Sequence, residues 1–185
     1  MLFRSRQRPG ELLHVDTKKL GRFSDVGHRI HGDYRRRTRG LGWEHVHVCV
    51  DDHTRLAYAE VLADERQETA VAFLRRAVRY FERFGITIQR VLTDNGSCYR
   101  AKRWYQTCQE LGIRVKKTRP YRPQTNGKAE RFIQTLLREW AYERPYKKSA
   151  HRRQRLRGWL RHYNEKRPHG SLGGQPPITR IQVQA

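Results

Sequence analysis

The alternation of apolar and polar positions along the chain predicts a β-sheet. Strict alternation, or a short apolar run bounded by turn residues, is typical of strands. These patterns predict five strands, at residues 11–20, 43–51, 55–62, 86–92 and 113–117. In the first strand, Leu13, Val15 and Thr17 fall on one face, and His14 and Asp16 fall on the other.

A second periodicity, with apolar residues three and four positions apart, predicts helices. It covers residues 68–84, 99–111, 128–142 and 151–163. The helix at 128–142 has the clearest pattern, because one apolar stripe runs through Ala129, Phe132, Ile133, Leu136, Leu137 and Trp140. Three strands precede the first helix, and strands and helices alternate after it. We therefore expect a mixed α/β fold in which an antiparallel hairpin region leads into crossover units.

Two acidic residues occupy strand positions that suggest chemistry. Asp16 lies inside an apolar strand, where a carboxylate is unfavourable unless it is paired or bound to a metal ion. The alternative is an edge-strand aspartate that faces water. Asp94 ends the fourth strand, where open sheets with helical crossovers place ligands. Asn95 and Gly96 predict a tight turn directly after it.

A third acid, Glu130, stands in the first turn of the helix predicted at 128–142, with 35 residues between it and Asp94. Helical spacing places Glu130 at the edge of the apolar stripe, so we expect its carboxylate to be turned away from open solvent and toward the strand ends. An acid that complements the helix dipole is the alternative. That alternative explains the place of Glu130 along the helix but not its pairing with Asp94.

Two other segments offer competing interpretations. Asp51 and Asp52 are rival metal ligands, but their place beside a turn favours hydrogen bonding to the turn's own backbone. The glycine-punctuated segment 21–42 carries Arg35, Arg36 and Arg37. It fits a solvated hairpin loop and a phosphate-contacting arm equally well.

The charge balance points to a polyanionic partner. Forty Lys and Arg against 18 Asp and Glu give a formal net charge of +22. Such self-repulsion is typical of proteins that bind nucleic acid, while an anionic membrane surface is the weaker candidate and a merely Arg-rich soluble protein the bland one. The last predicted helix adds to the basic character, and we expect it to follow DNA through Arg152, Arg153, Arg155, Arg157 and Arg161.

Cysteine use and hydropathy exclude several classes of protein. Cys49, Cys98 and Cys108 fit neither a disulfide framework nor a zinc site, and Cys49 is predicted to lie in the core. No apolar segment approaches the roughly 20 residues of a membrane span. The first residues lack the apolar run of a secretory signal. We therefore expect a cytoplasmic protein with no membrane association.

At its two acidic motifs the chain resembles a known family. The catalytic core of retroviral integrases is matched by Thr93-Asp94-Asn95-Gly96-Ser97 and by Tyr121, Pro123, Gln124, Gly127 and Glu130. Bacterial insertion-sequence transposases that use this core are similar over further stretches, at residues 15–21, 50–53, 118–131 and 163–169. The resemblance covers roughly residues 11–178 and implies a bacterial, nucleoid-associated protein.

The resemblance implies a ribonuclease H-like fold, with a mixed five-stranded sheet flanked by helices and a basic C-terminal helical tail. It assigns catalysis and metal binding to Asp16, Asp94 and Glu130. The resemblance, together with the basic segment at 21–42, predicts that nine residues contact DNA: Asn95, Ser97, Gln124, Asn126, Lys128, Arg131, Arg35, Arg36 and Arg37.

The expected organisation is a basic arm at 1–10, a catalytic core at 11–145 and a basic helix with an irregular tail at 146–185. Full-length relatives carry an N-terminal helix-turn-helix region, and this chain starts almost at its first catalytic strand, so we expect that region to be lacking. Retroviral integrases also carry lysines where this chain has Gln134 and Leu137.

These features predict a metal-dependent polynucleotidyl transferase acting on DNA. Carboxylates suit hard cations, so we expect two Mg²⁺ ions, with Mn²⁺ as a substitute, Asp16 bridging them and Asp94 and Glu130 each binding one. The expected reaction is cleavage at transposon ends and joining of the freed 3′-hydroxyl to target DNA by a homo-oligomer. The alternatives are a non-catalytic DNA-binding regulator derived from a transposase, and a ribonuclease H-like nuclease that does not join strands.

Overall fold

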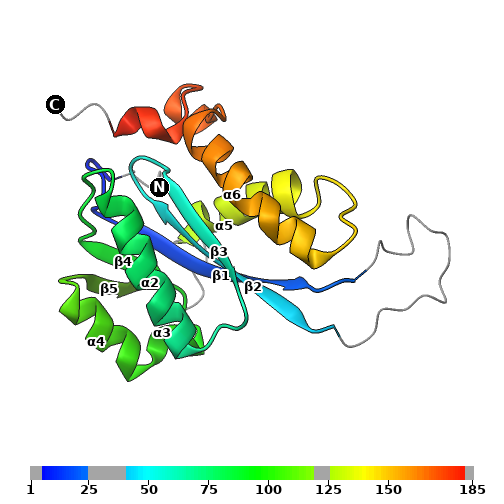
Figure 1. The fold of residues 1–185 in the computed structure, drawn as a ribbon. Helices are drawn as coiled ribbons and strands as arrows, with labels where there is room; N and C mark the ends of the chain where they lie inside the picture. The colour runs from blue at the N-terminus through cyan, green and yellow to red at the C-terminus, as the bar shows by residue number, and fades with distance from the viewer. Residues whose placement is uncertain (1–5, 25–40, 119–125, 182–185) are drawn as a thin grey trace.

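The computed structural model of the chain describes residues 6–24, 41–118 and 126–181 (Figure 1). Its strands are β1 (Leu13–Gly21), β2 (Trp43–Asp51), β3 (Ala57–Leu62), β4 (Arg90–Thr93) and β5 (Arg114–Lys117). Its α-helices are α2 (Gln67–Glu82), α3 (Ser97–Arg100), α4 (Lys102–Glu110), α5 (Gly127–Leu136) and α6 (Ser149–Glu165). A π-helical segment, η2 (Leu137–Ala141), continues α5, and two 3₁₀ turns follow α6, η3 (Gly170–Leu172) and η4 (Pro177–Arg180).

The five strands form one mixed sheet in the order β3-β2-β1-β4-β5. The first three are antiparallel neighbours, and β1, β4 and β5 are parallel. This is the predicted arrangement of an antiparallel region followed by crossover units. Parallel pairing places the carboxyl ends of β1 and β4 at the same region of the sheet, because the chain returns through α2 between them.

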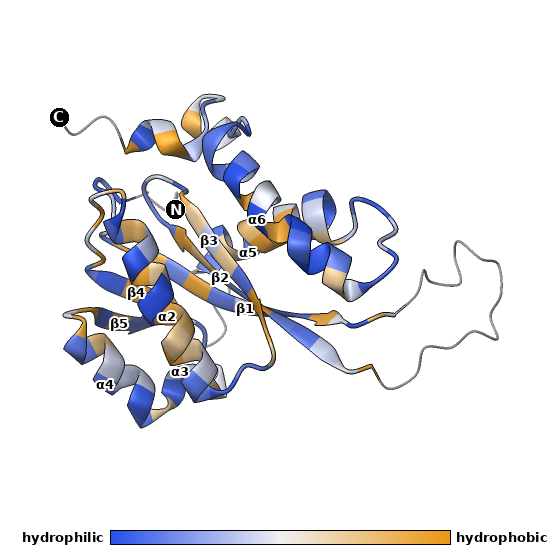
Figure 2. Ribbon diagram, viewed as in Figure 1, coloured by the Kyte–Doolittle hydropathy of each residue, from blue (hydrophilic) through white to orange (hydrophobic). Residues whose placement is uncertain are grey.

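Helices cover both faces of the sheet, α2 and α4 on one side and α5 and α6 on the other (Figure 1). The alternation of β1 explains the division. Leu13 and Val15 belong to the core shared with α2, whereas Leu20 belongs to the core shared with α5 and α6. Residues 14, 16 and 18 therefore face α5. Figure 2 shows hydrophobic and hydrophilic colours alternating along the central strands, and mostly hydrophilic colours on α6 interrupted by apolar positions.

Some element boundaries differ from those predicted. Residues 86–89 are not part of the fourth strand, which begins only at Arg90. The helix predicted at 99–111 is divided, because Ala101 takes an extended conformation with φ −66° and ψ 142° between α3 and α4. The helix predicted at 128–142 begins at Gly127 and changes to π geometry from Leu137 onward.

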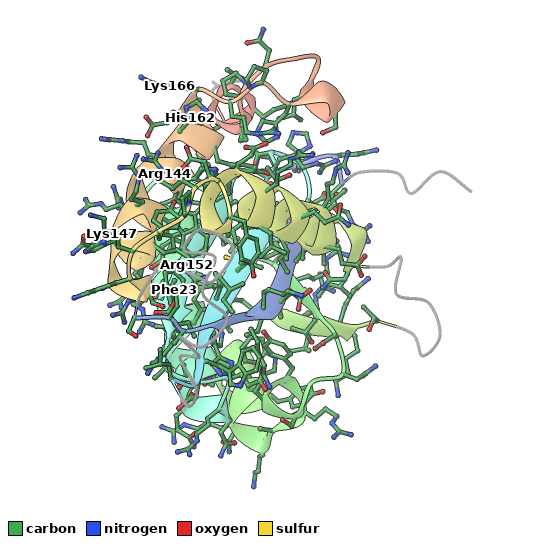
Figure 3. All side chains as sticks on the ribbon, turned by 90° about the vertical axis from the view of Figure 1, so that its right-hand side faces the viewer. Phe23, Arg144, Lys147, Arg152, His162 and Lys166 are labelled. Carbon is green, nitrogen blue, oxygen red and sulfur yellow. The ribbon has the colours of Figure 1, made fainter. Side chains whose placement is uncertain are left out.

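The arginine-rich helix α6 is anchored by one of its own arginines. Arg152 is 1% exposed, and its guanidinium donates to Glu44 at 2.8 Å and to the carbonyl oxygen of Gly21 at 2.9 Å. It also lies over the ring of Phe23, 4.9 Å from the centroid, as the labelled pair in Figure 3 shows. The expectation that Arg152 would follow DNA is therefore wrong. Because its charge is buried against Glu44, it holds α6 to the β1–β2 hairpin.

The far end of α6 is held to the edge strand β3 by Asn164. Its amide accepts from the backbone N–H of Ala57 at 2.9 Å and donates to the carbonyl of Ala57 at 2.8 Å. All three cysteines are buried and free, and the prediction that Cys49 lies in the core is confirmed. None of the helices in the described ranges is long and apolar enough to cross a bilayer.

Candidate active site

The sheet register brings two of the predicted catalytic acids together. In the parallel pair β1 and β4, Leu13 is the partner of Val91 and His14 is the partner of Leu92. Two residues further along each strand, the same register sets Asp16 opposite Asp94, and neighbouring strands lie roughly 4.8 Å apart. The Asp16 side chain is on the face that α5 covers, where the amide nitrogen of Asn126 lies 3.4 Å from it. The site therefore follows from strand order and register and needs no special loop.

The environment of Asp16 opposes its negative charge. Burial, together with the nearby charges of Asp94 and Glu130, raises the pKa of the Asp16 carboxyl from 3.8 to about 6. The backbone N–H of Thr17, 2.7 Å from Asp16 Oδ1, and the charge of Lys18 act in the opposite direction without prevailing. The charges of Asp94 and Glu130 thus both act on Asp16.

Asp94 lies beyond the end of β4 in the turn that the sequence predicted. Its Oδ1 accepts from the backbone N–H of Gly96 at 2.9 Å. A Cβ on residue 96 would lie 3.0 Å from that same oxygen. Glycine therefore lets the turn close against the carboxylate without crowding it. Asp94 itself is exposed.

Glu130 occupies the first turn of α5 and is exposed, so the expectation that it would be turned away from solvent is wrong. The apolar stripe is narrower than the spacing suggested, because Leu137 at its margin is itself only partly buried. The Glu130 carboxylate makes no hydrogen bond or ion pair with any described residue. Its charge nevertheless acts on Asp16.

A buried polar network fixes the start of α5 above the sheet. Asn126 is 3% exposed, and its amide nitrogen lies 3.4 Å from both the carbonyl of Val15 and the carboxylate of Asp16. Its amide oxygen lies 3.1 Å from His14 Nδ1, and His14 Nε2 lies 2.8 Å from Asp52 Oδ1. Because this network joins β1 to α5, it sets where Glu130 stands relative to Asp16.

The rival acids Asp51 and Asp52 are engaged within the fold. Asp51 accepts from the N–H and hydroxyl of Thr54 and from the N–H of Gly10, each at 2.8 Å, so the predicted turn role is confirmed. Burial raises the pKa of Asp51. Burial acts the same way on Asp52, but hydrogen bonds from His14, Arg6 and Lys128 outweigh it and hold the pKa of Asp52 below its ordinary value.

The predicted DNA contacts fall into three groups. Ser97 and Arg131 are exposed and follow Asp94 and Glu130 closely in sequence, and Asn95 is exposed with its amide 3.4 Å from the carbonyl of Thr118. Asn126 is buried and Lys128 pairs with Asp52 at 2.6 Å, so both are engaged within the protein. The remaining predicted residues lie outside the described ranges, namely Gln124, Arg35, Arg36 and Arg37.

The donor set suits hard divalent cations, since three carboxylates supply oxygen ligands and the cysteines are buried elsewhere. In the described part of the chain, no three His, Cys, Asp or Glu side chains converge closely enough to hold a metal ion as they stand. Burial is the main cause of the raised Asp16 pKa and the charges of Asp94 and Glu130 add to it, and a bound cation would offset both effects. Chemically, the residues therefore fit such an ion.

Sequence analysis missed the His14–Asp52–Lys128 part of the network. The only available signal was that His14 shares a face of β1 with Asp16, and histidines on such faces have many roles. Tyr99 was missed as well. Its hydroxyl lies 3.0 Å from that of Thr17, and its buried ring packs under the turn that carries Asp94.

Comparisons with known proteins identify the family and the fold. An integrase core domain model matches residues 6–123, more than half of the chain, and a second integrase core domain model matches residues 111–177. The solved catalytic core domain of BIV integrase superposes with a TM-score of 0.62 at 21% identity, covering 92% of each chain. The predicted ribonuclease H-like fold is thereby confirmed.

A second solved structure is the simian T-cell lymphotropic virus intasome in complex with a PP2A regulatory subunit. Its TM-score is 0.70 at 20% identity, over 97% of this chain and 58% of that chain. Such low identities speak to the fold alone.

Among curated proteins, the putative transposase InsD for insertion element IS2E of Escherichia coli is 40% identical over 94 residues, which is 51% of this chain and 43% of that protein. The InsD transposase of IS2A and its sister elements, also from Escherichia coli, matches equally well over 31% of its length. The match thus represents less than half of each relative. From the family match over most of its length, we conclude that this chain belongs to the integrase core domain family.

Proposed function

We propose that this chain is the catalytic part of a transposase that cuts DNA at the ends of a mobile element and joins the freed 3′-hydroxyl to target DNA. The observation that carries the proposal is the coupling of Asp16, Asp94 and Glu130. Burial is the main cause that raises the pKa of Asp16, on β1, to about 6, and the charges of Asp94, just after β4, and of Glu130, on α5, add to the rise. Strongly perturbed pKa values cluster at functional sites.

Asp16, Asp94 and Glu130 would hold two divalent cations, Mg²⁺ or Mn²⁺. When bound, such ions lower the pKa of an attacking water or hydroxyl and stabilise the departing oxygen of a phosphodiester. The protein's own residues supply position. Register fixes Asp16 opposite Asp94, and the Asn126–His14 network fixes the helix that carries Glu130. We assign the catalytic core to residues 11–145 and added DNA contacts to residues 146–185.

Two features support DNA as the substrate and more than one copy as the active unit. The chain carries a net charge of +22, and electrostatic binding to phosphates needs such an excess. Joining two element ends to a target also requires two active sites. The similarity to an integrase within an intasome assembly is in line with this expectation.

The test is the substitution Asp94→Asn, assayed with labelled duplexes that carry the element's terminal repeats, in buffer containing Mg²⁺ or Mn²⁺. We expect cleavage and strand transfer to fall by more than about a hundred-fold, because even residues that only support metal ligands are worth roughly 10- to 100-fold. DNA binding should persist. The matched control is Glu82→Gln, which removes one carboxylate from the exposed end of α2 and should leave the rate unchanged.

Strand transfer by the Asp94→Asn variant at the parent rate would refute the assignment. A pre-cleaved end used as substrate separates a transposase from a nuclease, because a nuclease would cut DNA but not join that end. A parent chain that binds DNA but shows no metal-dependent cleavage would instead be a non-catalytic regulator.

A further inference from the structure

Two of the proposed metal ligands lie beyond the paired parts of their strands. In the described part of the chain, the last paired positions of β1 and β4 are His14 and Leu92. Asp16 and Asp94 follow two residues later on each strand, and Asp94 already lies outside β4. The ladder therefore brings the two acids near each other, while other contacts must set their separation.

A continuous path of hydrogen bonds connects the two carboxylates through Thr17 and Tyr99. The backbone N–H of Thr17 donates to Asp16 Oδ1 at 2.7 Å, and the hydroxyl oxygens of Thr17 and Tyr99 are 3.0 Å apart. The backbone N–H of Tyr99 donates to the carbonyl of Gly96 at 3.1 Å, and the N–H of Gly96 donates to Asp94 Oδ1 at 2.9 Å. This path crosses from β1 to the turn after β4, so it links the two acids beyond the end of the ladder.

The Tyr99 side chain has little freedom to move. It is 2% exposed, it belongs to the core shared with α2, and its ring packs edge-on against Trp104 with the centroids 4.9 Å apart. A Cβ on residue 96 would lie 3.4 Å from the Tyr99 ring, so the ring lies directly against the turn that carries Asp94. Burial raises the pKa of the Tyr99 hydroxyl well above its ordinary value, so the hydroxyl keeps its proton and can donate it.

His47 determines the direction of these hydrogen bonds. Its Nε2 lies 2.8 Å from the carbonyl oxygen of Asp64, which can only accept, so Nε2 carries a hydrogen. The residue is fully buried, and burial lowers the pKa of its imidazole, so the ring is neutral and Nδ1 is an acceptor. The Thr17 hydroxyl lies 3.3 Å from that Nδ1. Thr17 therefore donates to His47 and accepts from Tyr99, an order that satisfies every group in the path.

We propose that Tyr99, Thr17 and His47 are positioning residues, which hold the carboxylates of Asp16 and Asp94 in place for the divalent cations. The inference rests on the proposed function. Successive side chains of a strand point to opposite faces, so Thr17 acts on Asp16 from the face of β1 that α2 covers. The polar network at the start of α5 acts on the same carboxylate from the other face.

The experiment measures the Mn²⁺ affinity of the full chain without DNA, from the electron paramagnetic resonance signal of the free ion. Tyr99→Phe and Thr17→Val each remove one hydroxyl and keep the shape of the side chain. We expect each to weaken Mn²⁺ binding by roughly tenfold, because groups that orient metal ligands are worth about 10- to 100-fold. Thr17→Ser keeps the hydroxyl and should bind nearly as well as the parent. An unchanged affinity in Tyr99→Phe, or an equal loss in Thr17→Ser, would overturn the proposal.

The matched control is Tyr146→Phe, in the segment between η2 and α6. It also removes a buried tyrosine hydroxyl, one that donates to the carbonyl of Trp140 at 2.8 Å. Each Phe variant loses one buried hydrogen bond, so the two should shift the midpoint of urea unfolding to a similar extent when a chelator is present. Only Tyr99→Phe should lose Mn²⁺ affinity. An equal loss of affinity in Tyr146→Phe would mean that general loosening of the fold is responsible, and the positioning role would fail.

A double variant tests whether the two hydroxyls act as one link. Tyr99→Phe combined with Thr17→Val should bind Mn²⁺ about as well as Thr17→Val alone, because the second change has no bond left to break. If the two losses multiply instead, the hydroxyls act separately and the path does not work as a unit.

The place of His47 is tested by ¹⁵N NMR of the imidazole nitrogens, with His47→Gln used to identify its signals. We expect the neutral form with its hydrogen on Nε2 near neutral pH, and a hydrogen on Nδ1 would overturn the order of donors. Failure of the proposed function is distinguishable from all these outcomes. It would appear as Mn²⁺ affinity that Asp94→Asn leaves unchanged.

Discussion

The Asp16 carboxylate destabilises the fold when it is ionised, and it is also one of the proposed metal ligands. Its carboxyl is placed among other acids and partly removed from water, and its pKa rises from 3.8 to about 6. A raised acid pKa means that the unfolded chain releases the proton first as pH increases. The contribution of Asp16 to stability is therefore greatest below about pH 4 and is lost as pH rises through 6, by roughly 3 kcal/mol at most.

This reasoning predicts that Asp16→Asn stabilises the metal-free protein. At pH 4 both proteins carry a neutral group, and their free energies of unfolding should agree. By pH 8 the variant should be more stable by about 1–3 kcal/mol, because the parent then holds an ionised carboxylate in an unfavourable place. Urea unfolding at several pH values in the presence of a chelator measures the difference.

Glu82→Gln, on the exposed end of α2, is the matched control and should show no gain that grows with pH. A gain for Asp16→Asn that is the same at pH 4 and pH 8 would mean that packing, and not charge, is responsible.

Whether the sequence could predict the role of a single residue depends on how far apart in sequence its contacts lie. Asp16 was identifiable because an acid inside an apolar strand is locally unfavourable, and Asp94 because it ends a strand. Asn126 was assigned to DNA only by resemblance, whereas its side chain bonds to His14, 112 residues away. A hydrogen bond between residues so far apart in sequence leaves no local sequence pattern. It can be recognised only in the folded structure, where β1 and α5 lie together.

At the scale of elements, periodicity located the strands and helices but not their ends. The strand predicted at 43–51 matches β2 in full, since an alternating run of nine residues is bounded by turn residues. The fourth strand is shorter than its apolar run because Ile86 and Ile88 are buried by packing alone, outside the ladder. The π geometry of η2 has no periodic signature in so short a segment.

The docking of α6 provides a prediction about one element. Arg152→Met should lower the free energy of unfolding by about 3 kcal/mol, since removing one partner of a buried ion pair leaves the other uncompensated. Glu44 is 1% exposed, and its remaining cation would be Arg153, at 3.3 Å. Chemical denaturation measures the loss. Arg157→Met, on the exposed side of the same helix, should change stability by less than about 0.5 kcal/mol.

A double variant tests the physical cause of that loss. Replacing Glu44 with Leu in the Arg152→Met protein removes the stranded charge, and part of the lost stability should return, because apolar pairs often replace buried ion pairs without loss. If the double variant is less stable than Arg152→Met alone, the contacts of Arg152 with Gly21 and Phe23, and not its charge pairing, hold the helix.

On the scale of the whole molecule, charge is the dominant feature. With +22 on 185 residues, the folded chain repels itself, and the same excess attracts DNA. Composition predicted this correctly, but it could not predict where the charge lies. Arg152 is buried in an ion pair with Glu44, and Arg167 pairs with Glu139. Arg131 and Arg138, in contrast, line a cavity. Only tertiary structure separates these uses.

The two consequences of net charge should respond to salt in opposite directions. Screening weakens the internal repulsion, so NaCl should raise the melting temperature, and a gain of about 1 kcal/mol corresponds to roughly 2–4 °C for a chain of this size. The same salt should weaken DNA binding steeply, by about a thousand-fold or more between roughly 50 and 200 mM if six or more phosphates are neutralised. Chloride is preferred to sulfate, because an anion that binds the folded chain stabilises it by mass action. A melting temperature that falls with NaCl would mean that salt weakens attractive ion pairs, such as Arg167–Glu139, more than it weakens the repulsion between the excess basic side chains. The net charge would then not be a source of instability in the folded chain.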